Sequence, residues 1–382
     1  METVKGFKDY SGEEALKREK VKSIIENIFK KYNFEPAETP IIEYEEFVKQ
    51  NPDDEAVSDV FKLQDKGKRK LALRYELTFQ LKRLMKNKKL PYRRYQIGKV
   101  FRDEPVSSNR FRQFTQCDID VINSTIKDDA EILKITSDIL NKLNIKFTIN
   151  INNRKLLNEI LEKLKIKNKI KVIKEIDKLD KLSESEVKKN LNKYNAESVL
   201  KIFKKPESYF EKYSSYNEIK ELKKLCRLYK IKINFQPSLA RGLSYYNGNV
   251  FEIKSSIKET IIAGGNYIFN NIQCSGISFG LERLTNLAKI SINKNRLLII
   301  SLNKDKEAIN LAEKTREFIP TQIYYGKIKK ALDYANSCNF PYVLFIGEEE
   351  LKKEKIKIKN MKSGKEIFIG VNNLVKYITN LK

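Results

Sequence analysis

An arginine followed by two adjacent tyrosines makes residues 239–253, LARGLSYYNGNVFEI, a candidate ligand-binding segment. Arg241 lies beside a glycine at a predicted turn before a strand, where its guanidinium can project into a cleft. Tyr245 and Tyr246 would point to opposite faces of that strand, so only one of them can line a given pocket. A bare tyrosine pair leaves an alternative open, in which one ring lies in the core and the other faces solvent.

Polar residues also alternate along residues 99–120, KVFRDEPVSSNRFRQFTQCDID. An arginine at a strand end, a basic loop and a returning strand would bring one set of side chains to a single sheet face: Arg102, Glu104, Gln116, Asp118 and Asp120. Such a face can bind a nucleotide, because an arginine can hold a phosphate through two hydrogen bonds. A surface hairpin with ordinary salt bridges is the alternative.

Two glycines and a third arginine complete the candidate set. Gly264 and Gly265 in AGGNYIFN would let the backbone approach a ligand closely. Arg283 in SGISFGLERL lies on a helix predicted to start after Gly280. The three arginines are far apart in sequence, and we expect them to converge on one nucleotide.

The chain contains no histidine. This excludes Ser-His-Asp and Cys-His catalysis, the HExxH metal helix and imidazole bases. No Walker A pattern occurs, and the widely spaced Cys117, Cys226, Cys274 and Cys338 disfavour a CxxC zinc site and indicate reduced thiols. Any chemistry must therefore use charge, positioning and groups of the substrate.

The composition indicates a basic protein of two to three domains. The 382 residues include 76 Lys and Arg against 50 Asp and Glu, which leaves a net charge of +26. Such a charge favours a polyanionic partner, although a Lys-, Ile- and Asn-rich composition set by an AT-biased genome explains part of it. No apolar run is long enough for a transmembrane helix, and the N-terminus lacks the apolar segment of a signal peptide, so we expect a cytoplasmic protein.

Hydrophobic periodicity predicts the elements that position these residues. Helical spacing covers residues 13–32, 77–86 and 128–143. Strand patterns cover residues 60–63, 70–73, 92–101, 113–121, 146–151, 231–234, 250–253, 259–263 and 276–279. Residues 154–230 contain no glycine and have a helical period, which predicts a helical insertion that splits the β-rich region. From about residue 295, strands alternate with helices, which predicts a separate α/β unit. The predicted division is therefore 1–153, 154–230, 231–292 and 293–382.

In order along the chain, these segments resemble the motifs of histidyl-tRNA synthetases, which are class II aminoacyl-tRNA synthetases. FRDE with its loop and QCDID resembles motif 2, RGLSYY resembles RGLDYY, and GLERL resembles motif 3. LALRYELT resembles LRPExT, and ETPIIE around Pro40 resembles motif 1, which lies at the dimer interface of this class. GEEELKKEKIKIKNMKSG resembles the class IIa anticodon-binding domain.

This resemblance implies a binding site for ATP. Arg102 and Arg241 would be the catalytic cations at the α-phosphate, with Arg102 also at the substrate carboxylate. Glu104 would bind the adenine amino group, Phe114 would stack on the base, and Arg283 would contact the adenine and the γ-phosphate. Mg²⁺ is implied only as the ion of ATP, without protein side chains as its ligands.

The resemblance also implies sites for histidine and for tRNA. Glu76 and Thr78 would bind the α-ammonium group, and the imidazole pocket would contain further residues: Gln116, Asp120, Tyr245, Tyr246 and Tyr267. Asp120 can accept from one ring nitrogen, and such a polar pocket rejects apolar analogues strongly. The tRNA acceptor end would face the loop residues Asn109, Arg110 and Arg112.

The implied fold is α+β, with an antiparallel class II catalytic sheet, a helical insertion and a C-terminal α/β anticodon-binding domain. The implied protein is a homodimer that binds histidine, ATP and tRNA(His), but neither DNA nor membranes. It departs from the family motifs at Tyr75, Thr115, Ser244, Asn247, Asn266 and Ile268. These departures leave open a catalytically degenerate paralogue that binds tRNA or regulates histidine biosynthesis, and a generic basic RNA-binding protein is a further alternative.

Overall fold

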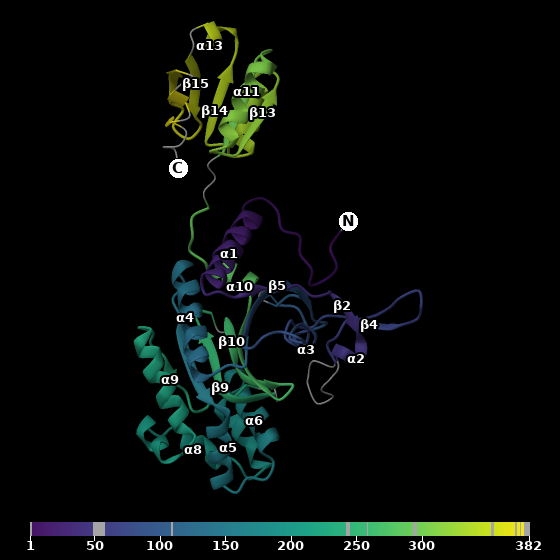
Figure 1. The fold of residues 1–382 in the computed structure, drawn as a ribbon, viewed down its shortest axis with the longest axis vertical. Coiled ribbons are helices and arrows are strands. Elements are labelled where there is room, and N and C mark those ends of the chain that lie inside the picture. Colours follow the sequence, from purple (N-terminus) through teal and green to yellow (C-terminus); the bar gives the residue numbers. More distant parts are fainter. Residues whose placement is uncertain are drawn as a thin grey trace. The chain divides into compact units, whose positions relative to one another are not determined.

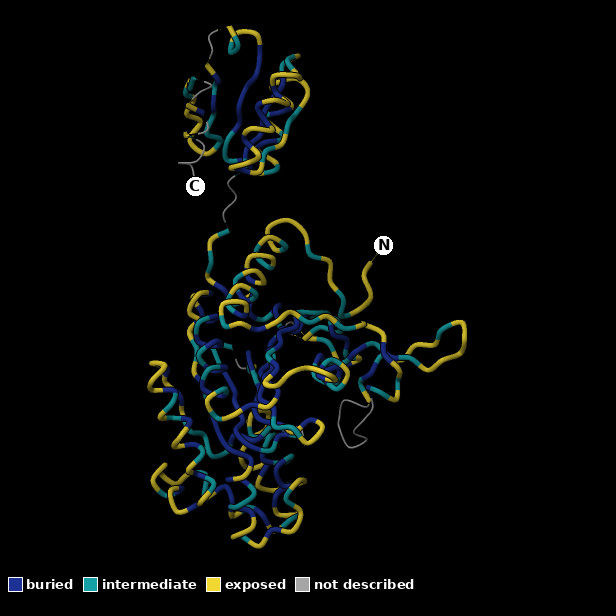
Figure 2. The backbone as a smooth tube through the Cα atoms, in the orientation of Figure 1, coloured by how far each residue is buried: buried dark blue, intermediate teal, exposed yellow. Residues whose placement is uncertain are grey.

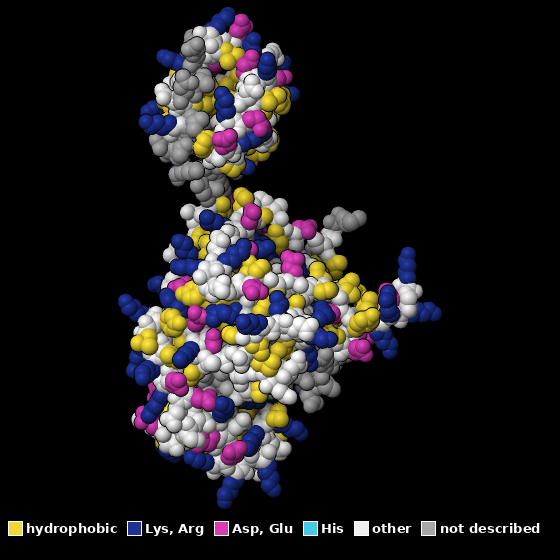
Figure 3. Space-filling view, viewed as in Figure 1, with side chains coloured by type: hydrophobic (Ala, Val, Ile, Leu, Met, Phe, Trp, Pro, Cys, Tyr) yellow, Lys and Arg dark blue, Asp and Glu magenta, His cyan; other side chains and the backbone are white. Residues whose placement is uncertain are grey.

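A computed structural model describes residues 2–48, 58–107, 110–241, 245–257, 259–292, 296–352, 355–370, 373–374 and 376–377. The chain forms two compact units, Met1–Ile290 and Ser291–Lys382 (Figure 1). The first unit contains every candidate ligand-binding residue predicted above. On the face seen in Figure 3, Lys and Arg side chains are spread over both units and do not gather in a single patch.

An eight-stranded sheet forms the framework of the first unit. Its strands, in spatial order, are β1 (Glu35–Pro36), β5 (Tyr92–Phe101), β6 (Gln113–Ile122), β11 (Ile272–Gly280), β10 (Ile262–Phe269), β9 (Tyr246–Lys254), β7 (Thr148–Asn153) and β8 (Asn234–Phe235). All neighbours are antiparallel except the two edge pairs, β1 with β5 and β7 with β8. A small second sheet has the order β2 (Ile42–Tyr44), β4 (Lys70–Leu73) and β3 (Lys62–Gln64), and the short helix α2 (Glu45–Val48) follows β2.

Helices bury one face of the large sheet, which we call the back face. They are α1 (Gly12–Lys31), α4 (Ile126–Lys142) and α10 (Leu281–Leu287). A capping box formed by Thr125 and Asp128 starts α4, whose apolar side then packs with alternate residues of β6, such as Ile119 and Val121, in the main core. The dark blue tube in Figure 2 follows this core. The opposite front face is covered in part by α3 (Leu81–Leu84), which packs against Tyr92, Ile122 and Tyr267.

The segment between β7 and β8 is helical, as its period predicts. It contains α5 (Arg154–Lys163), α6 (Lys169–Asp177), α7 (Glu184–Asn192), α8 (Ser198–Phe203) and α9 (Tyr216–Leu228), with short 3₁₀ turns at Lys178–Asp180 and Glu207–Lys212. Its buried residues, including Leu156, Val199 and Leu222, join the same core as the sheet. Its status as a separate insertion domain, and with it the predicted four-part division, stays a prediction.

The second unit is an α/β module with helices on both faces of its sheet. The strand order is β13 (Thr321–Tyr325), β12 (Leu297–Ser301), β14 (Tyr342–Ile346), β15 (Lys355–Asn360) and β16 (Glu366–Gly370). Its helices are α11 (Asp305–Arg316), α12 (Ile328–Ser337) and α13 (Glu348–Lys352). Alternate residues of β12 face two different cores: Leu297 packs with α11 residues, and Leu298 packs with α12 residues.

Several element boundaries differ from the sequence prediction. The predicted strands at 92–101 and 70–73 match β5 and β4, but the helix predicted at 77–86 is reduced to α3. One reason is that the Glu76 carboxylate accepts the backbone N–H groups of Thr78, at 3.0 Å, and Phe79, at 2.5 Å, which holds a turn there. In the part of the chain that is described, no helix is both long and apolar enough to cross a membrane. All four cysteines are free.

Gly264 serves strand packing, which differs from its predicted role in ligand approach. A Cβ atom at this position would lie 2.1 Å from the carbonyl oxygen of Gly276 and 2.7 Å from the Cα of Ile277, both on β11. Gly265 is likewise crowded, because a Cβ there would lie 2.5 Å from the carbonyl oxygen of Asn249. The two glycines therefore let β9, β10 and β11 pack closely.

Replacing Gly264 with alanine should destabilise the first unit. The added methyl group would push against the β11 backbone, and overpacking of this kind costs roughly 1–3 kcal/mol. Urea denaturation of the full chain measures the change. Gly67→Ala is the control, because its nearest neighbour would lie at an ordinary 3.4 Å. Equal midpoints for the two variants would contradict this account of the sheet.

Candidate active site

A buried ion pair lies at the centre of the front face. Arg94 on β5 is directly opposite Asp120 on β6, and its Nη2 atom lies 2.7 Å from Asp120 Oδ2. The same guanidinium donates to the carbonyl oxygen of Leu77, at 3.0 Å, and to Gln96 Oε1, at 3.3 Å. Arg94 has no solvent exposure and Asp120 has 3%. Asp120 is therefore fixed in position before any ligand arrives.

Carboxylates outnumber cations around this pair. Glu76 and Asp118 both interact with the charge of Arg94, which gives one guanidinium three acidic neighbours. Burial raises the pKa of Glu76 and of Asp120, and it raises the pKa of Asp118 to about 7. Burial alone would lower the pKa of Arg94, but Asp120 and Asp118 raise it above its usual value. A ligand that carries an ammonium group and a ring N–H donor would relieve this excess of acid.

Three tyrosines line the same region. The Tyr267 hydroxyl donates to Asp120 Oδ1 at 2.5 Å, and Tyr246 lies opposite Tyr267 in the β9–β10 register. The ring of Tyr245 lies 4.7 Å from that of Tyr246 and 5.9 Å from that of Tyr267. The prediction that Tyr245 and Tyr246 point to opposite faces was wrong, because Tyr245 precedes β9 and strand alternation does not apply to it.

Gln116 and Gly276 complete this half of the site. Gln116 Nε2 donates to Asp118 Oδ2 at 2.8 Å, as expected for alternate residues of one strand. Gly276 on β11 faces Asp120, and a Cβ atom there would lie 2.2 Å from Asp120 Oδ1. Asp120 therefore occupies the space that a side chain at position 276 would need.

A second cluster forms around Arg102. Its guanidinium carbon lies 4.4 Å from the ring centre of Tyr75 and 5.1 Å from that of Phe114. Glu104 accepts the Tyr75 hydroxyl at 3.3 Å and forms an ion pair with Arg110. These contacts bring together a cation, an acid and two aromatic rings from distant parts of the chain.

The loop between β5 and β6 is described only in part. Arg112 Nε donates to the carbonyl oxygen of Glu104 at 3.1 Å, so Arg110 and Arg112 both lie beside Glu104. Asn109 lies outside the described residues, as does Ser244 in the segment that follows Arg241. The predicted role of this loop at the tRNA acceptor end therefore stays a prediction.

Arg241 and Arg283 are linked through Glu252, which lies on β9, and Thr260, which lies in the loop before β10. Arg283 Nη1 donates to the carbonyl oxygen of Thr260 at 2.8 Å, and the Thr260 hydroxyl donates to Glu252. Arg241 Nη1 lies 3.8 Å from Glu252 Oε1. Burial lowers the pKa of Arg283, and the charge of Arg102 lowers it further. Arg283 therefore lies within electrostatic reach of Arg102 and is connected to Arg241 by three successive contacts.

Glu76 connects the two clusters. Its neighbour Tyr75 contacts Arg102. Burial raises the pKa of Tyr245, and the charge of Glu76 raises it further. In this structure the Glu76 carboxylate caps the backbone at Thr78 and Phe79. An α-ammonium group bound here would therefore share Glu76 with these two backbone N–H groups.

Sequence reasoning missed Arg94, Tyr75 and Glu252 as candidate site residues. Arg94 could have been found from the predicted hairpin, because a register that pairs residues 92 and 122 puts an arginine opposite Asp120. Tyr75 was noted only as a departure from the family motif. No local signal identified Glu252, which depends on contacts with Thr260 and Arg241 from different segments.

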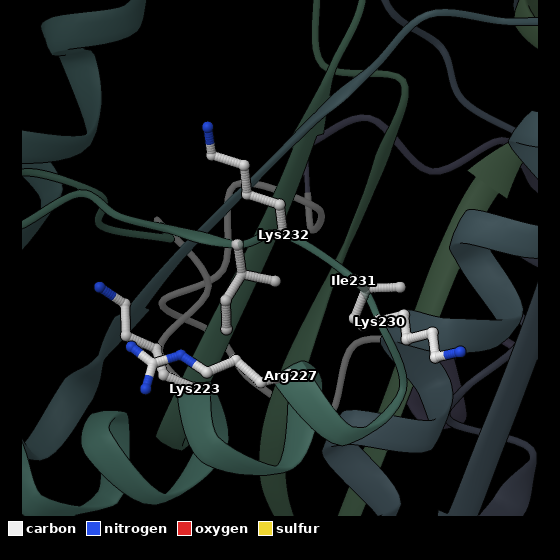
Figure 4. A pocket seen from close by; sticks show the side chains of 6 residues that line it. Lys223, Arg227, Lys230, Ile231 and Lys232 are labelled. Carbon is white, nitrogen blue, oxygen red and sulfur yellow. The ribbon is translucent and has the colours of Figure 1, made fainter.

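A separate cavity of about 430 Å³ lies at the end of α9, away from this site. It is lined by Lys223, Arg227, Lys230, Ile231, Lys232 and Ile233. Figure 4 shows that the labelled basic side chains extend in different directions. Within the described part of the chain, no group of three or more His, Cys, Asp or Glu residues could hold a metal ion.

Replacing Asp118 with asparagine should stabilise the fold increasingly as pH rises. The folded state keeps this carboxyl protonated up to about pH 7, whereas the unfolded chain releases the proton near its usual pKa of 3.8. The native state thus binds more protons between these values, so the wild-type carboxyl costs stability as pH rises through that window.

The test compares thermal midpoints of variant and wild type at about pH 5 and about pH 8. The thermal midpoint of Asp118→Asn minus that of wild type should be larger at about pH 8 than at about pH 5. Asp65→Asn is the control, because backbone and side-chain hydrogen bonds from Arg69 lower the pKa of Asp65 and its removal should give no gain. A gain that is equal at both pH values would show that ionisation of Asp118 is not the cause.

Comparisons with known proteins agree with this architecture. The family model for histidyl-tRNA synthetase matches residues 6–284, and the model for the anticodon binding domain matches residues 296–381. Histidine–tRNA ligase 1 of Bacillus cereus is 35% identical, with 99% of each chain covered. Histidine–tRNA ligase of Wolinella succinogenes is 33% identical, with 95% of this chain and 94% of the relative covered.

Solved structures share the fold over the same extent. Histidyl-tRNA synthetase from Nostoc sp. PCC 7120 has a TM-score of 0.86 at 23% identity, with 100% of this chain and 99% of that chain covered. An ATP phosphoribosyltransferase regulatory subunit/histidyl-tRNA synthetase from Bacillus halodurans has a TM-score of 0.76 at 19% identity, with 90% and 97% covered. The predicted fold class is confirmed, and the chain belongs to the histidyl-tRNA synthetase family.

Proposed function

We propose that this chain is a histidine–tRNA ligase that converts histidine and ATP to histidyl-adenylate and pyrophosphate, and then transfers histidine to the 3′ end of tRNA(His). The observation that carries the proposal is the acceptor at Asp120, held between Arg94 and the Tyr267 hydroxyl. It lies on a sheet face with excess acid, and Glu76, which interacts with this group, is the chain neighbour of Tyr75 in the Arg102 cluster. This arrangement suits a cationic amino acid next to a triphosphate.

In the histidine site, Asp120 accepts a hydrogen bond from one ring nitrogen. Tyr245, Tyr246 and Tyr267 form the walls around the ring, which their mutual packing supports. Glu76 supplies the charge that a buried ammonium group needs, with Thr78 and Gln116 as further polar partners. Because these groups would be left unpaired by an apolar side chain, the site discriminates strongly in favour of histidine.

In the ATP site, Arg102 and Arg241 stabilise the negative charge that develops on the α-phosphate. Glu104 and Phe114 bind the adenine, and Arg283 contacts the base and the γ-phosphate. The histidine carboxylate is itself the nucleophile, so activation depends on positioning and charge and needs no protein base. Mg²⁺ enters with ATP on its phosphate oxygens.

The tRNA contacts involve both units. Asn109, Arg110 and Arg112 face the acceptor end, and the second unit binds the anticodon region. The protein works as a homodimer in the cytoplasm, where ATP and tRNA are found. Exposed apolar side chains on β2 support contact with a second copy of the chain, because Ile42 is 52% exposed and Tyr44 is 53% exposed in the single chain.

Exchange of labelled pyrophosphate into ATP, run with each amino acid in turn, tests the proposal directly. We expect exchange with histidine alone among the standard amino acids. A degenerate paralogue or a general RNA-binding protein would show none. Binding of any RNA with strong salt dependence, together with no exchange, would replace the proposal with the second of these alternatives.

Replacing Arg241 with alanine should reduce histidine-dependent exchange by roughly 10²–10³-fold, the usual cost of losing one group that stabilises transition-state charge. The fold should survive, because the Arg241 side chain is partly exposed beside Glu252. Arg69→Ala is the matched control, since Arg69 is 65% exposed and forms an ion pair with Asp65 away from the candidate site. A wild-type exchange rate in the Arg241→Ala variant would contradict the assigned role.

A further inference from the structure

The pairing of β9 with β10 is interrupted beside the tyrosines of the front face. Gly265 pairs with Val250, and Tyr267 pairs with Tyr246. Two steps along β10, from Gly265 to Tyr267, therefore match four steps along β9, from Val250 to Tyr246. The extra residues of β9 form a bulge, which leaves backbone groups without their normal ladder partners.

Asn266 fills this bulge from β10. Its Oδ1 atom accepts the backbone N–H of Asn249 at 2.7 Å, and its Nδ2 atom donates to Asp129 Oδ1 at 2.7 Å. The carboxamide lies so close to β9 that a Cβ atom on Gly248 would be 2.7 Å from Asn266 Oδ1. Asn266 thus substitutes for a missing ladder bond and ties the bulge to α4.

Asp129 is the common acceptor behind the sheet. Besides Asn266 it accepts Asn249 Nδ2 at 2.9 Å and Ser275 Oγ at 2.6 Å, and it is 1% exposed. One carboxylate thereby joins α4 to β9, β10 and β11. The network continues through Asn153, which donates to Asn249 Oδ1 at 2.9 Å and to Glu218 of α9 at 2.6 Å.

The network and the candidate histidine pocket lie on opposite faces of the same strand. Asn266 points to the back face, and the next residue, Tyr267, points to the front, where its hydroxyl meets Asp120. On the side of the bulge away from Val250, Tyr246 is again paired in the ladder, with Tyr267. The position of both tyrosines therefore depends on how the bulge is held.

We propose that Asn266, anchored by Asp129, is a positioning residue that sets Tyr246 and Tyr267 against Asp120 and thereby controls histidine affinity. The inference rests on the proposed function, in which these three residues bind the imidazole ring. Asn266 contacts no substrate in this account and acts only through the bulge.

An asparagine is needed because the position requires an acceptor toward Asn249 and a donor toward Asp129 at the same time. Alanine supplies neither group. Aspartate has the same shape, but when ionised it puts a second carboxylate against Asp129. An arginine could not replace the asparagine, because a guanidinium has donors alone and cannot accept from the backbone N–H of Asn249.

Steady-state exchange kinetics of Asn266→Ala and Asn247→Ala test the proposal. Asn247 is the matched control, because it lies in the same bulge but its amide pairs with Gln273 and does not contact Asp129. Asn266→Ala should raise the KM for histidine by roughly 10- to 100-fold, the scale expected for misplaced binding groups. The KM for ATP should change less than about twofold in either variant. Equal effects on histidine KM in the two variants would overturn the inference.

Asn266→Asp gives a readout that a merely structural role would not move. A protonated carboxyl offers the same acceptor and donor as the amide, so this variant should approach wild-type histidine KM near pH 6 and lose affinity near pH 8. The titratable groups that interact with Asp129 are Asp128 on α4 and Cys226 on α9. Burial raises the pKa of Asp129 itself to about 6. Asp129 and these neighbours are present in both proteins, so the ratio of variant to wild type at each pH reports the added carboxyl at position 266 together with its coupling to Asp129. A ratio that does not vary with pH would count against the bridge.

A crystal structure of the Asn266→Asp variant at high pH separates failure of this inference from failure of the proposed function. The Tyr267 hydroxyl should move away from Asp120 whether or not the wild-type protein exchanges pyrophosphate. If the hydrogen bond between Tyr267 and Asp120 is unchanged, the inference is wrong even for an active enzyme. If wild type shows no histidine-dependent exchange while Tyr267 moves, the positioning role stands and the proposed function fails.

Discussion

The site depends on one buried ion pair, between Arg94 and Asp120. Neither side chain has appreciable contact with solvent, and removing one partner of such a pair typically costs 3–5 kcal/mol because the other charge is left unpaired. Asp120 also accepts a hydrogen bond from the Tyr267 hydroxyl, so an ion pair and a hydrogen bond together fix its orientation. Glu76 and Asp118 add further acid around the single guanidinium. The site therefore has an acceptor in a fixed position and more carboxyl groups than cations around it, which is why we propose that it binds a cationic amino acid.

The two faces of the large sheet have different roles. Its back face buries apolar residues against α1, α4 and α10, which makes the framework rigid. Its front face carries polar residues at alternate positions of β5 and β6, and Gly276 of β11 lies opposite Asp120. Gly264 and Gly276 lack side chains where strands or Asp120 come too close for a Cβ atom. At the buried polar network around Asp129, the back face controls the geometry of the front.

Much of this could be predicted from the sequence, and the failures have physical causes. Alternation of polar residues correctly brought Gln116, Asp118 and Asp120 to one face, and the motif resemblances identified the family. The length of α3 was wrong because a side-chain carboxylate competes with helix formation for backbone N–H groups. Arg94 was missed because its importance comes from the residue opposite it. The bulge was missed because a register shift belongs to two strands together and leaves no mark in either one.

The central claim is that Asp120 receives the substrate ring while the three arginines surround the triphosphate. A crystal structure with histidinol and ATP tests it most directly, because histidinol lacks the carboxylate and cannot react. The account predicts a ring nitrogen within about 2.7–3.2 Å of the Asp120 carboxylate, with Arg102, Arg241 and Arg283 in contact with the nucleotide. A ring bound elsewhere, or arginines that contact only protein groups in the presence of ATP, would contradict it.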